Sequence, residues 1–199
     1  TRAYQYELWS WGYNGWGGLG LTDRASRSSP VQVPGTTWDN GSGNLFATIA
    51  VKTDGTLWTW GGNETGELGL NNTTKYSSPV QVGSDTTWST DMNMFTMNYK
   101  ACYGIKTDGT LWSWGYNYAG MLGHNNETQY SSPIQVGSGT DWKALSDGGY
   151  YGIGALKTDG TLWAWGANNY GNLGLNNRTQ YSSPTQVGSG TDWEWLNYN

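Results

Sequence analysis

Reactive and charged side chains are scarce in this sequence of 199 residues, which holds one cysteine, one histidine and two phenylalanines. Charged residues make up 13% of the chain, about half of their share in a typical soluble domain. A single cysteine excludes an internal disulfide and a zinc site built from several cysteines. Catalysis needs converging acids, bases or nucleophiles, and few are available. We therefore expect a protein that is not an enzyme and that binds no metal or cofactor.

Long apolar runs are also missing, and no stretch approaches the roughly 20 apolar residues of a membrane-spanning helix. The net charge is −5, and the ten Lys and Arg residues are scattered along the chain. Nucleic-acid binders normally carry a basic stripe, because neutralising phosphates supplies most of their affinity. The composition therefore predicts neither membrane insertion nor nucleic-acid binding.

Glycine, tryptophan and tyrosine are abundant instead, at 31, 14 and 14 positions. The tetrapeptide W-x-W-G occurs four times at a spacing of about 50 residues, a period typical of repeat arrays. Its tryptophans are Trp9, Trp11, Trp58, Trp60, Trp112, Trp114, Trp163 and Trp165. The motifs G-x-L-G and S-S-P-x-Q-V and a lone tryptophan follow each copy. We therefore divide a single array over residues 1–199 into four units, approximately 1–49, 50–103, 104–154 and 155–199.

Each unit carries signals for β-strands rather than helices. An Asp-Gly pair stands between two strand-forming runs at Asp54, Asp108 and Asp159, which is the strongest short signal for a hairpin. Four short strands fit into a unit, and no helical periodicity is present. Four-stranded units of this length are the blades of β-propellers. The sequence thus predicts an all-β propeller of four tandem four-stranded blades, with the repeated tryptophans packed between blades.

One block of the repeat resembles a known family. The pattern K-T-D-G-T-L-W-x-W-G-x-N-x-x-G-x-L-G, present at 106–123 and 157–174, is similar to the regulator-of-chromosome-condensation repeat, and the likeness spans all four units. The resemblance implies a propeller, which has seven blades in the best-known members. Those members include the nucleotide-exchange factor of the GTPase Ran and a secreted inhibitor of β-lactamases. The near-identical units here are similar to copies in bacterial and phage proteins.

The two ends of the array do not meet in register. Aligning the repeats places Thr1 opposite Ala50 and Asn199 opposite Gly148, so a head-to-tail junction would omit the equivalents of 149–154. Either the chain is part of a longer polypeptide, or a neighbouring chain supplies the missing strand, since unpaired strand edges recruit partners. We favour these explanations, a larger or an oligomeric propeller, over a self-contained ring of four blades.

Variable aromatic residues after W-x-W-G are the candidates for binding, because loops at one end of a propeller form its usual contact surface. These positions are not required by the scaffold, and their side chains suit contact with a sugar or a peptide. The candidate residues are Tyr13, Trp16, Tyr116, Tyr118 and Tyr170.

The remaining chemical groups have structural explanations. His124 takes a position held by leucine in the other units, and Cys102 is expected in the core. The aspartates of the Asp-Gly pairs suit turns. Met92 and Met94 have the spacing of one strand face, where methionine fills gaps or serves an adaptable interface. We therefore assign no catalytic and no metal-binding residue.

Together these observations predict a non-enzymatic structural, adhesion or protein-interaction module. The resemblance to phage-borne repeats favours a component of a phage virion, as a tail fibre or capsid decoration, or of a cell-surface assembly. Such a protein would lie outside the cell or on the virion surface and would contact other copies of itself or surface proteins. The alternative is a free-standing propeller that inhibits a protein or binds glycans as a lectin.

Overall fold

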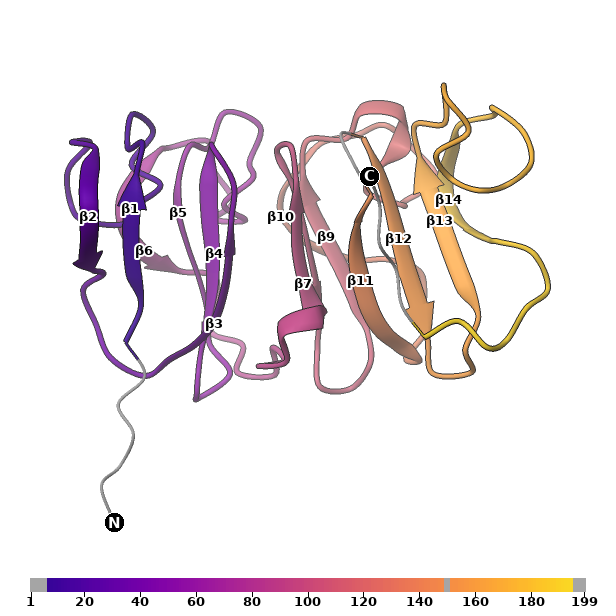
Figure 1. Ribbon diagram of the computed structural model, residues 1–199, viewed down its shortest axis with the longest axis horizontal. Helices are drawn as coiled ribbons and strands as arrows, with labels where there is room; N and C mark the ends of the chain where they lie inside the picture. The colour runs from indigo at the N-terminus through magenta and orange to yellow at the C-terminus, as the bar shows by residue number, and fades with distance from the viewer. Residues whose placement is uncertain (1–6, 149–150, 195–199) are drawn as a thin grey trace, which may run out of the picture.

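The computed structural model describes residues 7–148 and 151–194, which form a row of antiparallel β-sheets in chain order (Figure 1). The first sheet pairs β1 (Trp9–Gly12) with β2 (Arg27–Gln32). The next contains β3 (Trp38–Gly43), β4 (Ala47–Lys52), β5 (Leu57–Gly61) and β6 (Tyr76–Gln81). The third contains β7 (Phe95–Asn98), β8 (Ala101–Ile105), β9 (Leu111–Gly115) and β10 (Tyr130–Gln135). The fourth contains β11 (Trp142–Gly148), β12 (Gly152–Lys157), β13 (Leu162–Gly166) and β14 (Tyr181–Gln186).

In every sheet each strand pairs with its neighbours in the sequence, as in a propeller blade. The three complete sheets confirm the prediction of four-stranded all-β blades. They are offset from the sequence units, because β3 lies in the first unit, β5 and β6 lie in the second, and the boundary falls within β4. Strand β7 packs against both β3 and β11, so the first strands of the three complete sheets line the inner side of the row.

The two ends of the sheets differ in their connections. The long loop 13–26 joins β1 to β2, and the long loops 62–75, 116–129 and 167–180 join the third strand to the fourth in the three complete sheets. These loops, together with the short turns that precede β4, β8 and β12, are called the long-loop face. It runs along the upper edge of Figure 1. The Asp-Gly turns and the 3-10 helix η1 (Met92–Met94) lie at the opposite end of the strands.

Tryptophan side chains join consecutive sheets. Trp60, Trp114 and Trp165 are at most 1% exposed, and each indole donates a hydrogen bond to a G-x-L-G turn of the preceding unit. The bonds are Trp60 Nε1 to Gly18 O at 2.9 Å, Trp114 Nε1 to Glu67 O at 3.0 Å and Trp165 Nε1 to Met121 O at 2.8 Å. The glycine that ends each turn has a positive φ, and a Cβ there would lie less than 3 Å from the indole nitrogen. The motif glycines therefore provide the space into which the tryptophans pack.

In the three complete sheets, the first tryptophan of the W-x-W-G motif packs within its own sheet. Trp58, Trp112 and Trp163 are half-buried, and each contacts the tryptophan that precedes the sheet's inner strand or opens it. The tryptophans of the first motif differ, because the described chain has no sheet before β1. Trp9 is 48% exposed and Trp11 is 60% exposed.

The methionine-rich segment departs from the prediction. Met92 and Met94 lie in η1 and not on a strand, because the Asp91 carboxylate accepts a hydrogen bond from the Asn93 N–H and starts a helical turn. Phe95 and Met97 are buried in β7, and the half-buried Met94 packs against two neighbouring core clusters. Met94 therefore fills a gap in the core, as one of the two explanations held. The prediction that it lies on a strand face was wrong.

A buried asparagine organises each long loop. Asn168 is fully buried, and its Nδ2 donates to Asn177 O and Thr179 O at 3.0 Å each. Its Oδ1 accepts from the Leu173 N–H at 3.0 Å. Asn14, Asn63 and Asn117 repeat this arrangement in the other units. Hydrogen bonds from the buried asparagine therefore fix the conformation of each long loop.

Replacing Asn168 by alanine should lower the free energy of unfolding by about 2–3 kcal/mol, because the buried amide makes three hydrogen bonds to the backbone of its loop. The neighbouring Asn169 is exposed, so Asn169→Ala is the matched control and should change stability by less than about 0.5 kcal/mol. Urea unfolding followed by tryptophan fluorescence measures both. Equal losses in the two variants would contradict the role given to the buried amide.

Candidate functional site

All five aromatic residues proposed from the sequence lie in the long loops. Tyr170 is 92% exposed, Tyr13 61% and Tyr118 44%, while Trp16 and Tyr116 are half-buried. They come from three of the four loops, because the loop 62–75 carries none of them. The structure brings Trp16, Tyr116 and Tyr118 into a larger group of rings and leaves Tyr13 and Tyr170 outside it.

This group, called the aromatic row, crosses the long-loop face from the first loop to the third. Its members are Trp16, Phe46, Tyr99, Tyr116, Tyr151 and Tyr118. Successive ring centroids are 6.3 Å apart for Trp16 and Phe46, 5.4 Å for Phe46 and Tyr99, and 5.5 Å for Tyr99 and Tyr116. The last two contacts have the edge-to-face geometry that aromatic pairs prefer. The row is therefore continuous across neighbouring sheets.

Three members of the row were missed from the sequence: Phe46, Tyr99 and Tyr151. Each lies in the short connection between the first and second strands of a sheet. The repeats do carry a signal, since an aromatic residue stands one or two positions before the second strand in all three complete sheets. Sequence reasoning considered only the loops after W-x-W-G and therefore did not use it.

Tyr99 has an unusual backbone conformation, with φ at +50°. Bulky side chains rarely adopt this left-handed region, and such residues are concentrated at functional sites. The Asn44 amide of the preceding sheet donates to Tyr99 O at 2.7 Å and holds this turn. The contact fixes the ring of Tyr99 between Phe46 and Tyr116.

Two lysines flank the first half of the row. Lys75 Nζ lies 4.1 Å from the ring centroid of Trp16, and Lys100 Nζ lies 5.1 Å from that of Phe46, both within range of a cation–π interaction. Glu64 pairs with Lys100 at 2.6 Å and with Lys75 at 3.0 Å. Hydrogen bonds from these two lysines lower the pKa of Glu64 to about 2. The three groups therefore carry a net charge of +1 at neutral pH.

A serine and a histidine lie at hydrogen-bond distance, a pair that the sequence analysis did not predict. Ser113 Oγ lies 2.9 Å from His124 Nε2. However, Ser113 is fully buried and donates its hydroxyl proton to Leu122 O at 2.7 Å. Ser10 and Thr59 make the same bond to the corresponding leucine in other units. Since the hydroxyl proton is used, the histidine acts as the donor in this pair and does not activate the serine as a base.

The other reactive groups are also used structurally. Asp54, Asp108 and Asp159 each accept hydrogen bonds from the threonine two positions later, and these bonds lower the pKa of the three aspartates. The buried Cys102 donates to Glu67 O at 3.0 Å, and burial raises the pKa of its thiol. Within 7–148 and 151–194, no group of three His, Cys, Asp or Glu residues is placed to hold a metal ion.

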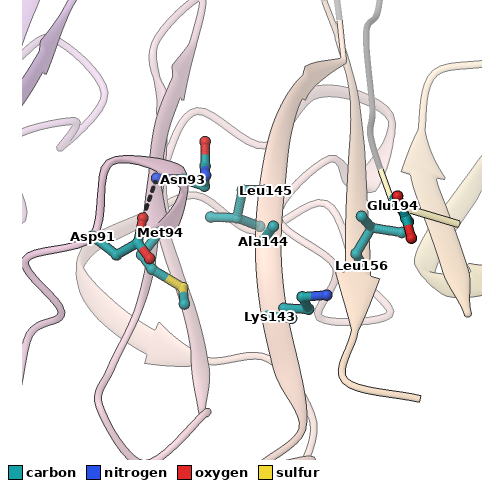
Figure 2. Close-up of a pocket in the computed structure, with 8 residues that line it drawn as sticks. All are labelled: Asp91, Asn93, Met94, Lys143, Ala144, Leu145, Leu156 and Glu194. Carbon is teal, nitrogen blue, oxygen red and sulfur yellow. Dashed lines mark hydrogen bonds between the residues drawn. The ribbon is translucent and has the colours of Figure 1, made fainter. Parts of the chain in front are cut away.

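A cavity of about 290 Å³ lies at the other end of the strands, between η1 and β11 (Figure 2). Its lining residues are Asp91, Asn93, Met94, Lys143, Ala144, Leu145, Leu156 and Glu194. The polar groups are two carboxylates, an amide and a lysine, and Asp91 is engaged in capping η1. This lining contains no nucleophile paired with a base. In the part of the chain that the structure describes, no helix is long and apolar enough to cross a membrane.

His124→Leu should leave the fold intact, because leucine occupies this position in the other three units, and stability at pH 8 should stay within about 1 kcal/mol. Burial lowers the pKa of His124 below 6.5, so the unfolded chain takes up a proton first as the pH falls. Stability that is present above about pH 6.5 is therefore lost below it. Melting temperatures between pH 8 and 5 should show a smaller decline in His124→Leu. An unchanged decline would mean that His124 is not the titrating group.

Comparison with known proteins agrees with this architecture. The sequence model of the "Regulator of chromosome condensation (RCC1) repeat" matches residues 7–38, 54–91, 108–152 and 159–194. The chain is 30% identical to the Ultraviolet-B receptor UVR8 of Arabidopsis thaliana over 185 residues, which cover 91% of this chain and 42% of the plant protein. The chain thus spans less than half of the length of this relative.

Solved structures show the same fold. Prp20p from Saccharomyces cerevisiae superposes with a TM-score of 0.74 at 16% identity, over 92% of this chain and 46% of the yeast chain. Human WBSCR16 superposes with a TM-score of 0.69 at 20% identity, over 90% of this chain and 47% of the human one. The repeat matches cover most of the sequence and confirm the resemblance found in its motifs. The chain belongs to the regulator of chromosome condensation (RCC1) repeat family.

Proposed function

We propose that this chain is a protein-interaction module that binds a partner protein through the aromatic row of the long-loop face. The observation that carries the proposal is the row itself, which extends across neighbouring sheets and ends at the exposed ring of Tyr118. Tyrosine and tryptophan are enriched among the residues that dominate binding energy at protein interfaces. No catalytic function is proposed, because the Ser113–His124 pair is engaged structurally.

The aromatic row is also preorganised in the chain without a partner. The rings of Tyr116 and Tyr118 are nearly parallel, with 7° between their planes. The ring centroids of Tyr118 and Tyr151 are 4.9 Å apart. The buried amide of Asn117 holds the loop between the two tyrosines. Since ordering side chains on binding costs affinity, a preorganised surface binds more tightly than a mobile one.

Relatives support a protein partner without identifying it. The work on the yeast protein concerns its binding to Gsp1p and histones, and another structure shows it bound to Kap60. These are properties of Prp20p. The low identity relates the two chains by fold alone, so the partner of this chain is to be found by experiment.

Tyr118→Ala should reduce partner binding about tenfold, the loss expected for one aromatic anchor of roughly 1–2 kcal/mol. The immobilised chain would capture partners from an extract of the cells that produce it, and quantitative mass spectrometry would compare variants. Asn93→Ala, in the cavity at the opposite end of the strands, is the control and should bind as the parent does. Capture unaffected by Tyr118→Ala would place the binding surface elsewhere.

Glycan binding is a second candidate, favoured by the exposure of Tyr13 and Tyr170 outside the aromatic row. Exposed rings of this kind stack on sugars. A glycan array on which Tyr13→Ala and Tyr170→Ala lose the signal would support a lectin. Uniform absence of signal for the parent chain would reject it.

The finer assignment to a phage virion or a cell-surface assembly remains a prediction from the near-identical repeats. The relatives compared above are eukaryotic. The mass of the native particle in its source material tests this assignment, because a virion or surface component would occur in a large assembly with many copies.

A further inference from the structure

Two cavities occupy equivalent junctions between consecutive sheets. The first, of about 510 Å³, lies between the sheet of β3 to β6 and the sheet of β7 to β10. The second, of about 430 Å³, lies between the sheet of β7 to β10 and the sheet of β11 to β14. Both volumes fall within the range of small-molecule sites, about 300–1,000 Å³. The linings correspond position by position: Val82, Trp88, Lys106 and Pro133 in the first cavity match Val136, Trp142, Lys157 and Pro184 in the second.

The second cavity, called the histidine cavity, differs from the first in residue type at two lining positions. His124 replaces Leu70, and Gly139 replaces Asp85. In the first cavity the carboxylate of Asp85 pairs with Lys106. The histidine cavity therefore gains an imidazole and has no side chain where its counterpart has a carboxylate. Since both sets of residues suit the same backbone, these two positions are free to determine what each cavity binds.

Three polar atoms surround Gly139 in the wall of the histidine cavity. A Cβ on this glycine would lie 3.0 Å from Asp141 Oδ1, 3.4 Å from Trp142 Nε1 and 3.9 Å from Lys157 Nζ. Lys157 pairs with the other oxygen of Asp141 at 3.2 Å. Asp141 Oδ1 and Trp142 Nε1 are buried and have no hydrogen-bond partner among the described residues. Because buried polar atoms without a partner are unfavourable, a ligand that bonds to these two atoms is stabilised.

His124 supplies a further acceptor to the same cavity. Its Nε2 donates to Ser113 Oγ at 2.9 Å, and its ring stands edge-on to Tyr130 with the ring centroids 5.1 Å apart. Burial lowers the pKa of His124 below its usual value of 6.5, so the ring is neutral at pH 7.5. A neutral imidazole that donates from Nε2 has an acceptor lone pair on Nδ1. No group in the part of the chain that the structure describes donates to this atom.

The combination of donors and acceptors favours a ligand with hydroxyl groups. Trp142 Nε1 and Lys157 Nζ are donors, and His124 Nδ1 and Asp141 Oδ1 are acceptors. A hydroxyl group both donates and accepts, whereas a carboxylate or phosphate only accepts and an ammonium group only donates. Lys157 and Asp141 also neutralise each other, so the cavity offers little net charge to an ion. Val136 and the Trp142 ring add apolar surface, which suits the C–H faces of a sugar ring.

We propose that the histidine cavity binds one neutral sugar unit. Its hydroxyls donate to His124 Nδ1 and Asp141 Oδ1, and they accept from the indole N–H and the lysine that line the cavity. The turn 137–140, which is largely exposed, shifts outward to admit the sugar to the two buried atoms beside Gly139. This site shares no residue with the aromatic row, so it holds or fails independently of the proposed protein partner.

The single histidine of the chain makes the cavity observable by NMR. The full chain, labelled at histidine, would be titrated at pH 7.5 with the methyl glycosides of glucose, galactose, mannose and N-acetylglucosamine. At least one glycoside should shift the His124 ring resonances and saturate below about 10 mM. Inorganic phosphate, the anionic comparison probe, should leave them unchanged. Unchanged resonances with all four glycosides, or a shift with phosphate alone, would overturn the proposal.

Variants test which residues bind the sugar, with saturation-transfer NMR on the glycoside as the readout. His124→Leu keeps the residue found in the other units and should weaken binding about tenfold, since one hydrogen-bond acceptor is lost. Gly139→Ala places a methyl group against the two buried atoms and should weaken binding to a similar extent. Ser138→Ala changes an exposed neighbour and is the matched control, and Tyr118→Ala tests independence from the aromatic row.

Both controls should bind the glycoside as the parent does, and thermal melts check that every variant is folded. Binding that survives His124→Leu and Gly139→Ala would place the sugar elsewhere on the chain and overturn the assignment to this cavity. An equal loss in folded Ser138→Ala would do the same, because this side chain does not line the cavity.

Discussion

The fold depends on one repeated contact, in which an indole packs against the glycine turn of the preceding unit and donates its N–H to the turn's carbonyl. The contact buries a large aromatic surface and satisfies the one polar atom of the ring. It also requires glycine at the last position of G-x-L-G, because a side chain at Gly69 would occupy the place of Trp114. Each unit is thereby joined to its neighbours, and stability accumulates along the array.

The same construction separates scaffold from surface. The buried asparagines and the indole bonds hold the long loops, so the residues between these fixed points are free to differ among units. The aromatic row uses that freedom: Trp16 in the first unit and Tyr118 in the third occupy loop positions that carry other residues elsewhere. Binding sites are commonly built from variable loop residues on a rigid scaffold, because the residues that set specificity can then change without disturbing the fold.

The Ser113–His124 pair shows why proximity alone does not indicate catalysis. Two residues with catalytic potential lie at hydrogen-bond distance, yet the serine belongs to a series that bonds a leucine carbonyl in several units. Burial keeps substrates away from the hydroxyl and lowers the pKa of the histidine. Comparing the units with each other therefore assigns the pair a structural role.

The sequence by itself determined the repeat, the β-strands, the Asp-Gly hairpins and the family, because periodic glycines and tryptophans follow from local geometry that every unit must satisfy. It also identified three of the six rings in the aromatic row. Phe46, Tyr99 and Tyr151 do recur at one place in the repeat, but their contact with the loop residues depends on separate sheets packing side by side, which the sequence does not show. The helical turn at Met92–Met94 depended on the Asp91 cap, which the spacing of methionines does not encode.

Tertiary structure alone decided which tryptophans are buried. Trp11 and Trp114 occupy the same position in the same motif, yet one is 60% exposed and the other fully buried. The difference arises because burial of this residue comes from the preceding unit and not from its own. A repeat sequence specifies the interface of every unit, whereas the position of a unit in the array decides whether that interface is occupied.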